Sequence, residues 1–395
     1  MAHNKLEANL QDQHGQGGHG AIPLSAGMLL VTLGVVYGDI GTSPMYTMKS
    51  IVANNGGIGT VSEDMILGAL SLVIWTMTLV TTVKYVVIAM KADNHNEGGI
   101  FALFSLVRKV APWLILPAMI GGAALLADGI LTPAVTVTTA IEGLRTIEWG
   151  HALLGDGQTN VIIITIIIIC GLFAMQRAGT SSIGKLFGPL MTLWFLFLAG
   201  AGLFNMLGNL SILRALNPIR GIMFLFSPIN HSGIMVLGFV FLSTTGAEAL
   251  YSDMGHVGKA NIYASWPFVK AALILNYLGQ GAWLLANNSN PQMLAMDIVN
   301  PFYMMLPEPL RPFALCFGRA PSSLAGAHHR LVSLVSEATR LTLSPHLRIH
   351  YPSDTKGSRS ILPLVNTSCG SLHSSSCCCS RTPSAWRAPM ASPLP

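Results

Sequence analysis

The chain has 395 residues, of which 51% are hydrophobic and 10% charged, and its mean hydropathy is +0.55. Soluble domains carry about 25% charged residues, so this composition excludes an ordinary soluble protein and indicates a chain that needs lipid as its solvent. The formal net charge is +5. Because the basic residues are scattered over short loops rather than gathered in a stripe, nucleic-acid binding is not expected.

Hydropathy divides the chain into three parts: a polar cytoplasmic N-terminus (1–23), a transmembrane domain (24–310) and a C-terminal tail (311–395). A bilayer core about 30 Å thick needs about 20 apolar residues per helix, and on this scale we expect about seven transmembrane helices. They lie at 24–50, 65–90, 112–143, 159–176, 186–208, 230–251 and 265–287.

Charges in the loops predict the orientation of these helices. Basic residues follow the second and fourth expected spans: Lys91, Arg108, Lys109, Arg177 and Lys185. Since Lys and Arg collect on the cytoplasmic side, the N-terminus is expected in the cytoplasm. Arg214 and Arg220 then fall on the outer side and oppose this count.

The tail loses the apolar pattern. Residues 318–330 read GRAPSSLAGAHHR, and the segment after Thr367 is rich in Ser, Cys, Pro and Arg, so we expect disorder there. Five of the six cysteines lie beyond Arg311, and three of them are adjacent. This spacing does not suit a zinc site, and no metal site is expected beyond one for a transported ion.

The first expected span is interrupted by the sequence GVVYGDIGTSP at 34–44, in which three glycines and a proline oppose a continuous helix. A break at membrane depth is tolerated where the freed backbone faces protein or a water-filled cavity. Secondary transporters build ion sites in this way, with unwound carbonyls as ligands. Asp39 lies in the break, where an ionisable group costs at least about 2.5 to 3.5 kcal/mol and needs a cation, a proton or a buried partner.

The third expected span carries a polar stripe. Its members are spaced by four, three, four and three residues and share one helical face: Asp128, Thr132, Val135, Thr139 and Glu142. At 1.5 Å per residue the two carboxylates are roughly 21 Å apart, too far to hold one ion together. We expect Pro133 to kink this helix beside Asp128.

In the sixth expected span, Thr245 and Glu248 are three residues apart, which places the hydroxyl beside the carboxylate. Together with Asp39, Asp128 and Glu142, Glu248 makes a set of four acids on predicted spans. Such an excess of buried negative charge favours cations, although it does not distinguish potassium from sodium or protons. For the loop at 91–100 we expect a turn that docks against the bundle.

Five segments, in order, closely resemble the Kup/HAK/KT potassium-transporter family: YGDIGTSPMY (37–46), ADNHNEGGIFAL (92–103), LLADGILTPAVTVTTAIEGL (125–144), TTGAEALYSDMGH (244–256) and SWPFVKAALILNYLGQGAWLL (265–285). The resemblance runs from about Ser25 to Leu310. It implies an all-α bundle of the LeuT/APC-like inverted-repeat class, whose second repeat is incomplete here. It also implies proton-coupled potassium symport in the bacterial inner membrane, with potassium and protons as substrates, no cofactor and no enzymatic activity. A homodimer is left open.

The resemblance assigns roles to residues of this chain. Asp39 resembles the carboxylate that couples protons and binds potassium, and Glu142 resembles a functionally important glutamate that we place in proton coupling. The other residues that match potassium ligands are Tyr46, Asp128, Thr132, Thr245 and Glu248.

The family pattern departs near Arg311, resumes at 334–357 and 363–366, and fails after Thr367, which we interpret as local changes of reading frame. A channel is not expected, because the chain has no TVGYG-like filter. Two alternatives stay open: an amino-acid or organocation permease of the same fold, and a nonfunctional transporter fragment that inserts but does not transport.

Overall fold

The computed structural model describes residues 22–93, 98–125, 127, 160, 162–167, 180–288, 290, 299–311 and 313–314. Every regular element in these ranges is a helix, which confirms the all-α expectation for this part of the chain. Four helices there are long and apolar enough to cross a membrane: Glu63–Lys91, Phe187–Gly208, Gly233–Ser252 and Lys259–Asn287. A pair bent by 52°, Ala26–Val35 with Ile40–Asn54, adds a fifth.

These five correspond to five of the seven expected spans. Of the other two, 112–143 is described only as far as a short apolar helix at Pro112–Leu125, and 159–176 only in part, so both lie mainly outside the described residues. The elements are α2 (Ala26–Val35), η1 (Ile40–Met45), α3 (Thr47–Asn54), η2 (Ile58–Thr60), α4 (Glu63–Thr76), η3 (Met77–Ile88), η4 (Ala89–Lys91), α5 (Ile100–Val107), η5 (Pro112–Leu114), α9 (Thr180–Gly208), η6 (Leu210–Leu216), α10 (Pro218–Leu225), η7 (Gly233–Met235), α11 (Val236–Phe241), η8 (Leu242–Thr244), α12 (Ala249–Ser252), α13 (Met254–Val257), α14 (Lys259–Asn287), α16 (Pro301–Met304) and η9 (Glu308–Leu310).

Helix starts follow local sequence signals. Ser25 caps α2, where its Oγ accepts a hydrogen bond from Met28 N at 3.2 Å. Ser62 does the same for α4, and its Oγ accepts from Met65 N at 3.2 Å. These side-chain acceptors satisfy backbone N–H groups that have no partner within the helix.

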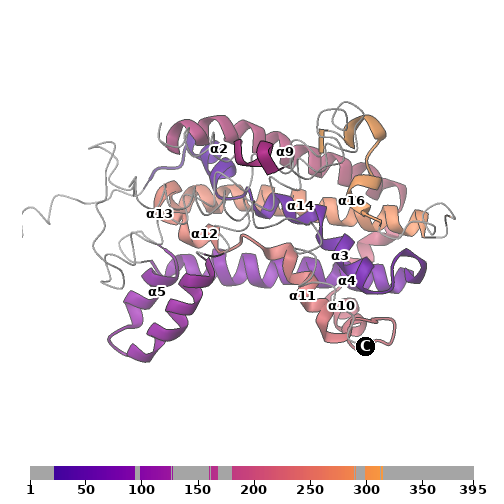
Figure 1. The fold of residues 1–395 in the computed structure, drawn as a ribbon, viewed down its shortest axis with the longest axis horizontal. Helices are drawn as coiled ribbons and strands as arrows, with labels where there is room; N and C mark the ends of the chain where they lie inside the picture. The colour runs from indigo at the N-terminus through magenta and orange to yellow at the C-terminus, as the bar shows by residue number, and fades with distance from the viewer. Residues whose placement is uncertain are drawn as a thin grey trace, which may run out of the picture.

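The long helices α9, α14 and α4 run side by side, with α14 between the other two (Figure 1). Glycines bring α9 against α14: a Cβ on Gly202 would lie 2.3 Å from Leu275 O, and one on Gly279 would lie 2.5 Å from the Gly202 Cα. Glycine also brings α9 against α2, since a Cβ on Gly188 would lie 2.4 Å from Leu30 O. Small residues of this kind let membrane helices approach at backbone distance.

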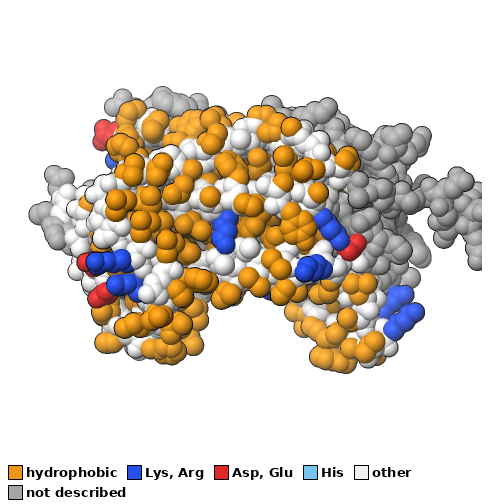
Figure 2. Space-filling model, turned by 180° about the vertical axis from the view of Figure 1, so that it is seen from behind, with side chains coloured by type: hydrophobic (Ala, Val, Ile, Leu, Met, Phe, Trp, Pro, Cys, Tyr) orange, Lys and Arg blue, Asp and Glu red, His pale blue; other side chains and the backbone are white. Residues whose placement is uncertain are grey.

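The outer surface of the bundle is apolar. Figure 2 shows hydrophobic side chains over most of one face, with charged side chains only in isolated places. Large apolar side chains such as Phe204, Phe226 and Ile120 are more than two thirds exposed. Lipid is the solvent in which such a surface is stable, which agrees with the composition.

The loop after η4 docks on the bundle, as expected. Asp93 Oδ1 pairs with Lys259 Nζ at 2.5 Å, and the Tyr251 hydroxyl donates to Ala92 O. Gly98 packs so closely on Tyr251 that a Cβ there would meet its carbonyl oxygen. Residues 94–97 lie outside the described part.

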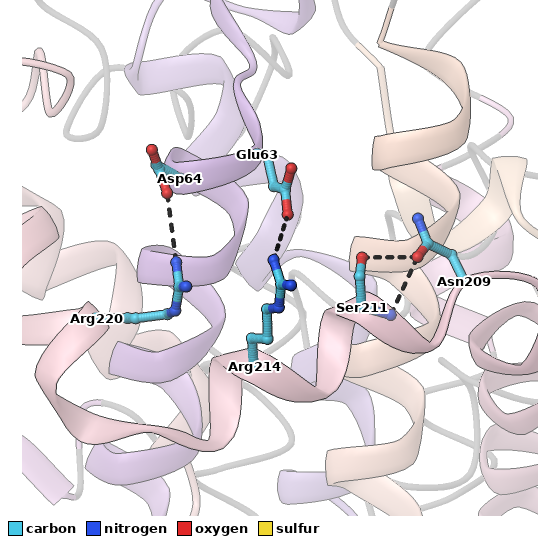
Figure 3. Close-up of polar contacts among 6 residues, drawn as sticks. All are labelled: Glu63, Asp64, Asn209, Ser211, Arg214 and Arg220. Carbon is cyan, nitrogen blue, oxygen red and sulfur yellow. Dashed lines mark hydrogen bonds and ion pairs between the residues drawn. The ribbon is translucent and has the colours of Figure 1, made fainter.

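The two arginines that oppose the charge count are each paired with an acid. Arg214 Nη1 lies 3.7 Å from Glu63 Oε1, and Arg220 Nη1 lies 3.3 Å from Asp64 Oδ1 (Figure 3). Both acids are in the first turn of α4, so η6 and α10 meet the start of α4 at one end of the bundle. The net charge of these two pairs is zero.

Candidate cation site at two helix breaks

The first helix break lies between α2 and α3 and forms the 3-10 helix η1, which contains Pro44. In a 3-10 helix the carbonyl of one residue accepts from the N–H three residues later. Because Pro44 has no N–H, Gly41 O cannot receive this bond. The interruption expected from the glycines and the proline is therefore present, as a tight 3-10 turn.

Carbonyl oxygens of this break accept hydrogen bonds from distant side chains. Trp194 Nε1 of α9 donates to Gly41 O at 2.9 Å. Gln280 Nε2 of α14 donates to Pro44 O at 2.9 Å, and Asn300 Nδ2, at the start of α16, donates to Met45 O at 3.0 Å. Each carbonyl oxygen has two lone pairs, so one hydrogen bond leaves it able to bind a cation, and the role of unwound carbonyls as ion ligands stays a prediction. Side-chain oxygens near the break are further candidates.

The second helix break lies between η8 and α12. Thr245 is extended, with φ −56° and ψ 133°, and Gly246 has φ +83°. A positive φ favours glycine, because in other residues this conformation brings the Cβ too close to the following carbonyl oxygen. The chain then resumes α-helix at Ala249.

The two breaks meet at Asp39. A Cβ built on Gly246 would lie 2.7 Å from Asp39 Cβ and 3.0 Å from Asp39 Oδ2, so the carboxylate rests directly on the Gly246 backbone. Asp39 is only 4% exposed. Its carbonyl oxygen accepts from the Thr42 N–H at 3.1 Å and from Thr42 Oγ1 at 2.8 Å.

Hydroxyl groups surround this contact. The Tyr46 hydroxyl is 3.3 Å from Ser43 Oγ, has the Thr42 and Thr245 side chains as further hydrogen-bond neighbours, and lies within the electrostatic reach of Asp39. The structure thus brings Asp39 and Tyr46 of the first break together with Thr245 of the second, which is far away in the sequence.

The remaining predicted residues are placed less directly. Glu248 is half-buried directly before α12, and its charge acts on Tyr85 of η3. Asp128, Thr132 and Glu142 lie outside the described residues, so their roles stay predictions.

Sequence reasoning missed the residues that hold the breaks. Asn276 and Gln280 are fully buried and four residues apart on α14, with Gln280 Nε2 donating to Asn276 Oδ1 at 2.8 Å. The sequence did contain a signal for these two amides, since they lie on one face of an apolar span. It contained no signal for Trp194, whose role depends on a contact with a distant residue, or for Gly246, whose role depends on a backbone angle.

The apolar exterior, the crossing helices and the buried carboxylate between two broken helices define an integral membrane protein of the helical class. The sequence model of the K+ potassium transporter integral membrane domain matches residues 26–375. The chain therefore belongs to the K+ potassium transporter family, which is a family of transporters and not of enzymes.

Curated relatives agree with this assignment. The chain is 57% identical over 341 residues to the probable potassium transport system protein Kup 1 of Lactococcus lactis, and 55% identical over 341 residues to the probable potassium transport system protein Kup of Streptococcus pyogenes serotype M3; each alignment covers 85% of this chain and 50% of the relative. A Kup 2 protein of Bifidobacterium longum is 53% identical over 343 residues, which are 86% of this chain and 46% of the relative. The chain spans about half the length of the curated relatives it matches.

Proposed function

We propose that the chain binds potassium where its two broken helices meet and serves potassium uptake across the membrane by proton-coupled symport. The observation that carries this proposal is the Asp39 carboxylate, buried at membrane depth against Gly246 of the second break. Family membership and the potassium transport proteins among the relatives support the choice of ion.

The chemistry of the described site suits a monovalent cation. Carboxylate and hydroxyl oxygens of Asp39, Tyr46 and Thr245 are hard ligands of the kind that alkali cations prefer, and one carboxylate balances one positive charge. Thr132, Asp128 and Glu248 complete the proposed ligand set. A charged group inside a membrane segment costs at least about 2.5 to 3.5 kcal/mol, and either a cation or a proton offsets this cost.

The same property supports proton coupling, because a carboxylate that alternates between potassium and a proton links the two movements. We assign this role to Asp39 together with Glu142. Moving one charge inward across about 100 mV releases about 2.3 kcal/mol, so potassium with a proton releases about 4.6 kcal/mol. That free energy supports a potassium gradient of more than about three decades.

Two broken helices that meet at their breaks also support a LeuT-like inverted-repeat arrangement. The basic residues that follow the second and fourth expected spans support an N-terminus in the cytoplasm of a bacterial cell. The permease alternative is not favoured, because the family and the relatives are named for potassium.

Binding is tested first, on the purified 395-residue chain in detergent. We expect potassium to raise its melting temperature more than sodium or choline does. The Asp39→Asn variant keeps the shape of the side chain and removes its charge, so it should lose this effect. Asp64→Asn is the matched control, because Asp64 is an exposed acid whose side chain is 75% accessible. Equal shifts with potassium and choline would contradict the proposed site.

Transport is tested in a bacterial strain that lacks potassium uptake. We expect the chain to restore rubidium uptake, and we expect a protonophore to stop it. Asp39→Asn and Glu248→Gln should abolish uptake while both proteins remain in the membrane, since removing a charge makes a span easier to insert. Uptake that ignores the protonophore and leaves external pH unchanged would refute proton coupling.

A further inference from the structure

Gln280 makes one of the contacts that hold the first break. The first backbone hydrogen bond at the start of α3 joins Ser50 N to Tyr46 O at 2.9 Å, beyond Pro44. The donor recorded for Pro44 O is Gln280 Nε2, at 2.9 Å. This donor comes from α14, which is a continuous helix, so a rigid element fixes the peptide group of a discontinuous one.

A second bond fixes Gln280 itself. Its Nε2 also donates to Asn276 Oδ1 at 2.8 Å, and Asn276 Nδ2 donates to Leu198 O of α9 at 3.0 Å. Both recorded partners of Nε2 are acceptors, so both of its protons are used and the orientation of the amide is determined. The chain of bonds runs from α9 through α14 to the break.

The oxygen of the same amide lowers the stability of the fold. Gln280 is fully buried, and its Oε1 has no hydrogen-bond partner among the described residues. A buried acceptor without a partner lowers stability, and an apolar side chain of the same length would avoid the penalty. The hydrogen bonds that Nε2 donates are therefore the reason for an amide at this position despite the cost of the buried Oε1.

The neighbouring turn of α14 contacts the same segment. The Tyr277 hydroxyl donates to Thr47 Oγ1 at 3.3 Å, and Thr47 Oγ1 donates to Ser43 O at 2.9 Å. One face of α14 therefore touches the break on both sides of Tyr46.

We propose that Gln280 is a positioning residue of the cation site: its amide fixes the Pro44 carbonyl and thereby holds Tyr46 toward Asp39 and Thr245. This inference rests on the proposed potassium site. The effect on the ion is indirect, because Gln280 contacts the segment that carries the ligands.

The test uses two measurements on the purified 395-residue chain. Hydrogen exchange of the amides at 40–50 reports whether the segment is held, with or without an ion. Potassium-dependent melting, repeated with sodium, reports affinity and selectivity. Gln280→Met keeps the length of the side chain and removes the donor, whereas Gln280→Glu, neutral when buried, keeps one donor. The control is Asn205→Leu, which removes a similar amide that donates to Met305 O at 3.2 Å, outside the break.

We expect Gln280→Met to speed exchange at 40–50, to weaken potassium binding by about 10- to 100-fold, as loss of an outer-shell partner does, and to reduce the preference for potassium over sodium. Gln280→Glu should recover part of both effects, and Asn205→Leu should show neither. Unchanged exchange in Gln280→Met, or faster exchange with unchanged affinity and selectivity, would overturn the proposal. If the unaltered chain binds no cation, the proposed function fails on this chain and the positioning role fails with it; faster exchange in Gln280→Met alone would then identify a structural contact.

Discussion

Replacing Gly246 by alanine would add a methyl group at the point where the two helix breaks meet. That methyl carbon would lie 2.7 Å from Asp39 Cβ, 3.0 Å from Oδ2 and 3.2 Å from Cγ, which is closer than carbon atoms pack. Overpacking of this kind costs about 1 to 3 kcal/mol. The backbone adds a second cost, because φ is +83° and an alanine in the left-handed region costs about 1 to 2 kcal/mol.

The sum, about 2 to 5 kcal/mol, is smaller than the about 5 to 15 kcal/mol by which domains are stable. We therefore expect Gly246→Ala to fold with a lower melting temperature. The Asp39 carboxylate must move to relieve the contact, so potassium binding should weaken by about tenfold or more, as displaced ligand geometry does at other sites. Both quantities are measured by melting the purified chain with and without potassium.

Gly233→Ala separates the two costs. Gly233 has φ +54°, and a Cβ there would meet nothing within 4 Å, so this variant loses stability through its backbone conformation alone. We expect it to lose stability and to keep its potassium affinity. Equal loss of stability in the two variants, with potassium affinity unchanged in both, would refute the contact between the breaks.

Three further variants test the packing and the surface. Trp194→Phe should lower stability by about 1 to 3 kcal/mol, because Gly41 O loses its donor, and should speed hydrogen exchange in the first break. Gly202→Ala should destabilise by about 1 to 3 kcal/mol or more, since the methyl meets α14 backbone, whereas Gly200→Ala, with nothing within 4 Å, should be neutral or slightly stabilising in denaturation measurements. Arg220→Ala should cost at most about 1 kcal/mol, and high salt should remove the difference in melting temperature.

Local chemistry made the first break predictable. Three glycines and Pro44 within eleven residues oppose a continuous helix, so an interruption at Asp39 followed from the sequence, whereas single prolines such as Pro189 of α9 and Pro267 of α14 stay inside long helices. The grouping of Tyr46 and Thr245 with Asp39 came from the resemblance to a family, because nothing local joins residues so far apart in the chain. The donors to the break were not predictable, since their positions depend on how α9 and α14 pack.

The two ion pairs at the end of the bundle were not predictable for a similar reason. Arg220 and Asp64 are 156 residues apart in the chain, and the packing of η6 and α10 on α4 brings both arginines to their acids.

Helix α9 determines the geometry of a site to which it contributes no proposed ligand. It meets α2 at Gly188 and α14 at Gly202, both at backbone distance, and Trp194 lies between these two contacts. Any side chain at either glycine would move a neighbouring helix outward. A shift of α2 would break the hydrogen bond from Trp194 Nε1 to Gly41 O. A shift of α14 would break the bond from Asn276 Nδ2 to Leu198 O, and Asn276 is the residue that orients Gln280. Because two continuous helices set where the discontinuous one stands, the distance from Asp39 to Gly246 depends on glycines far from the candidate cation site.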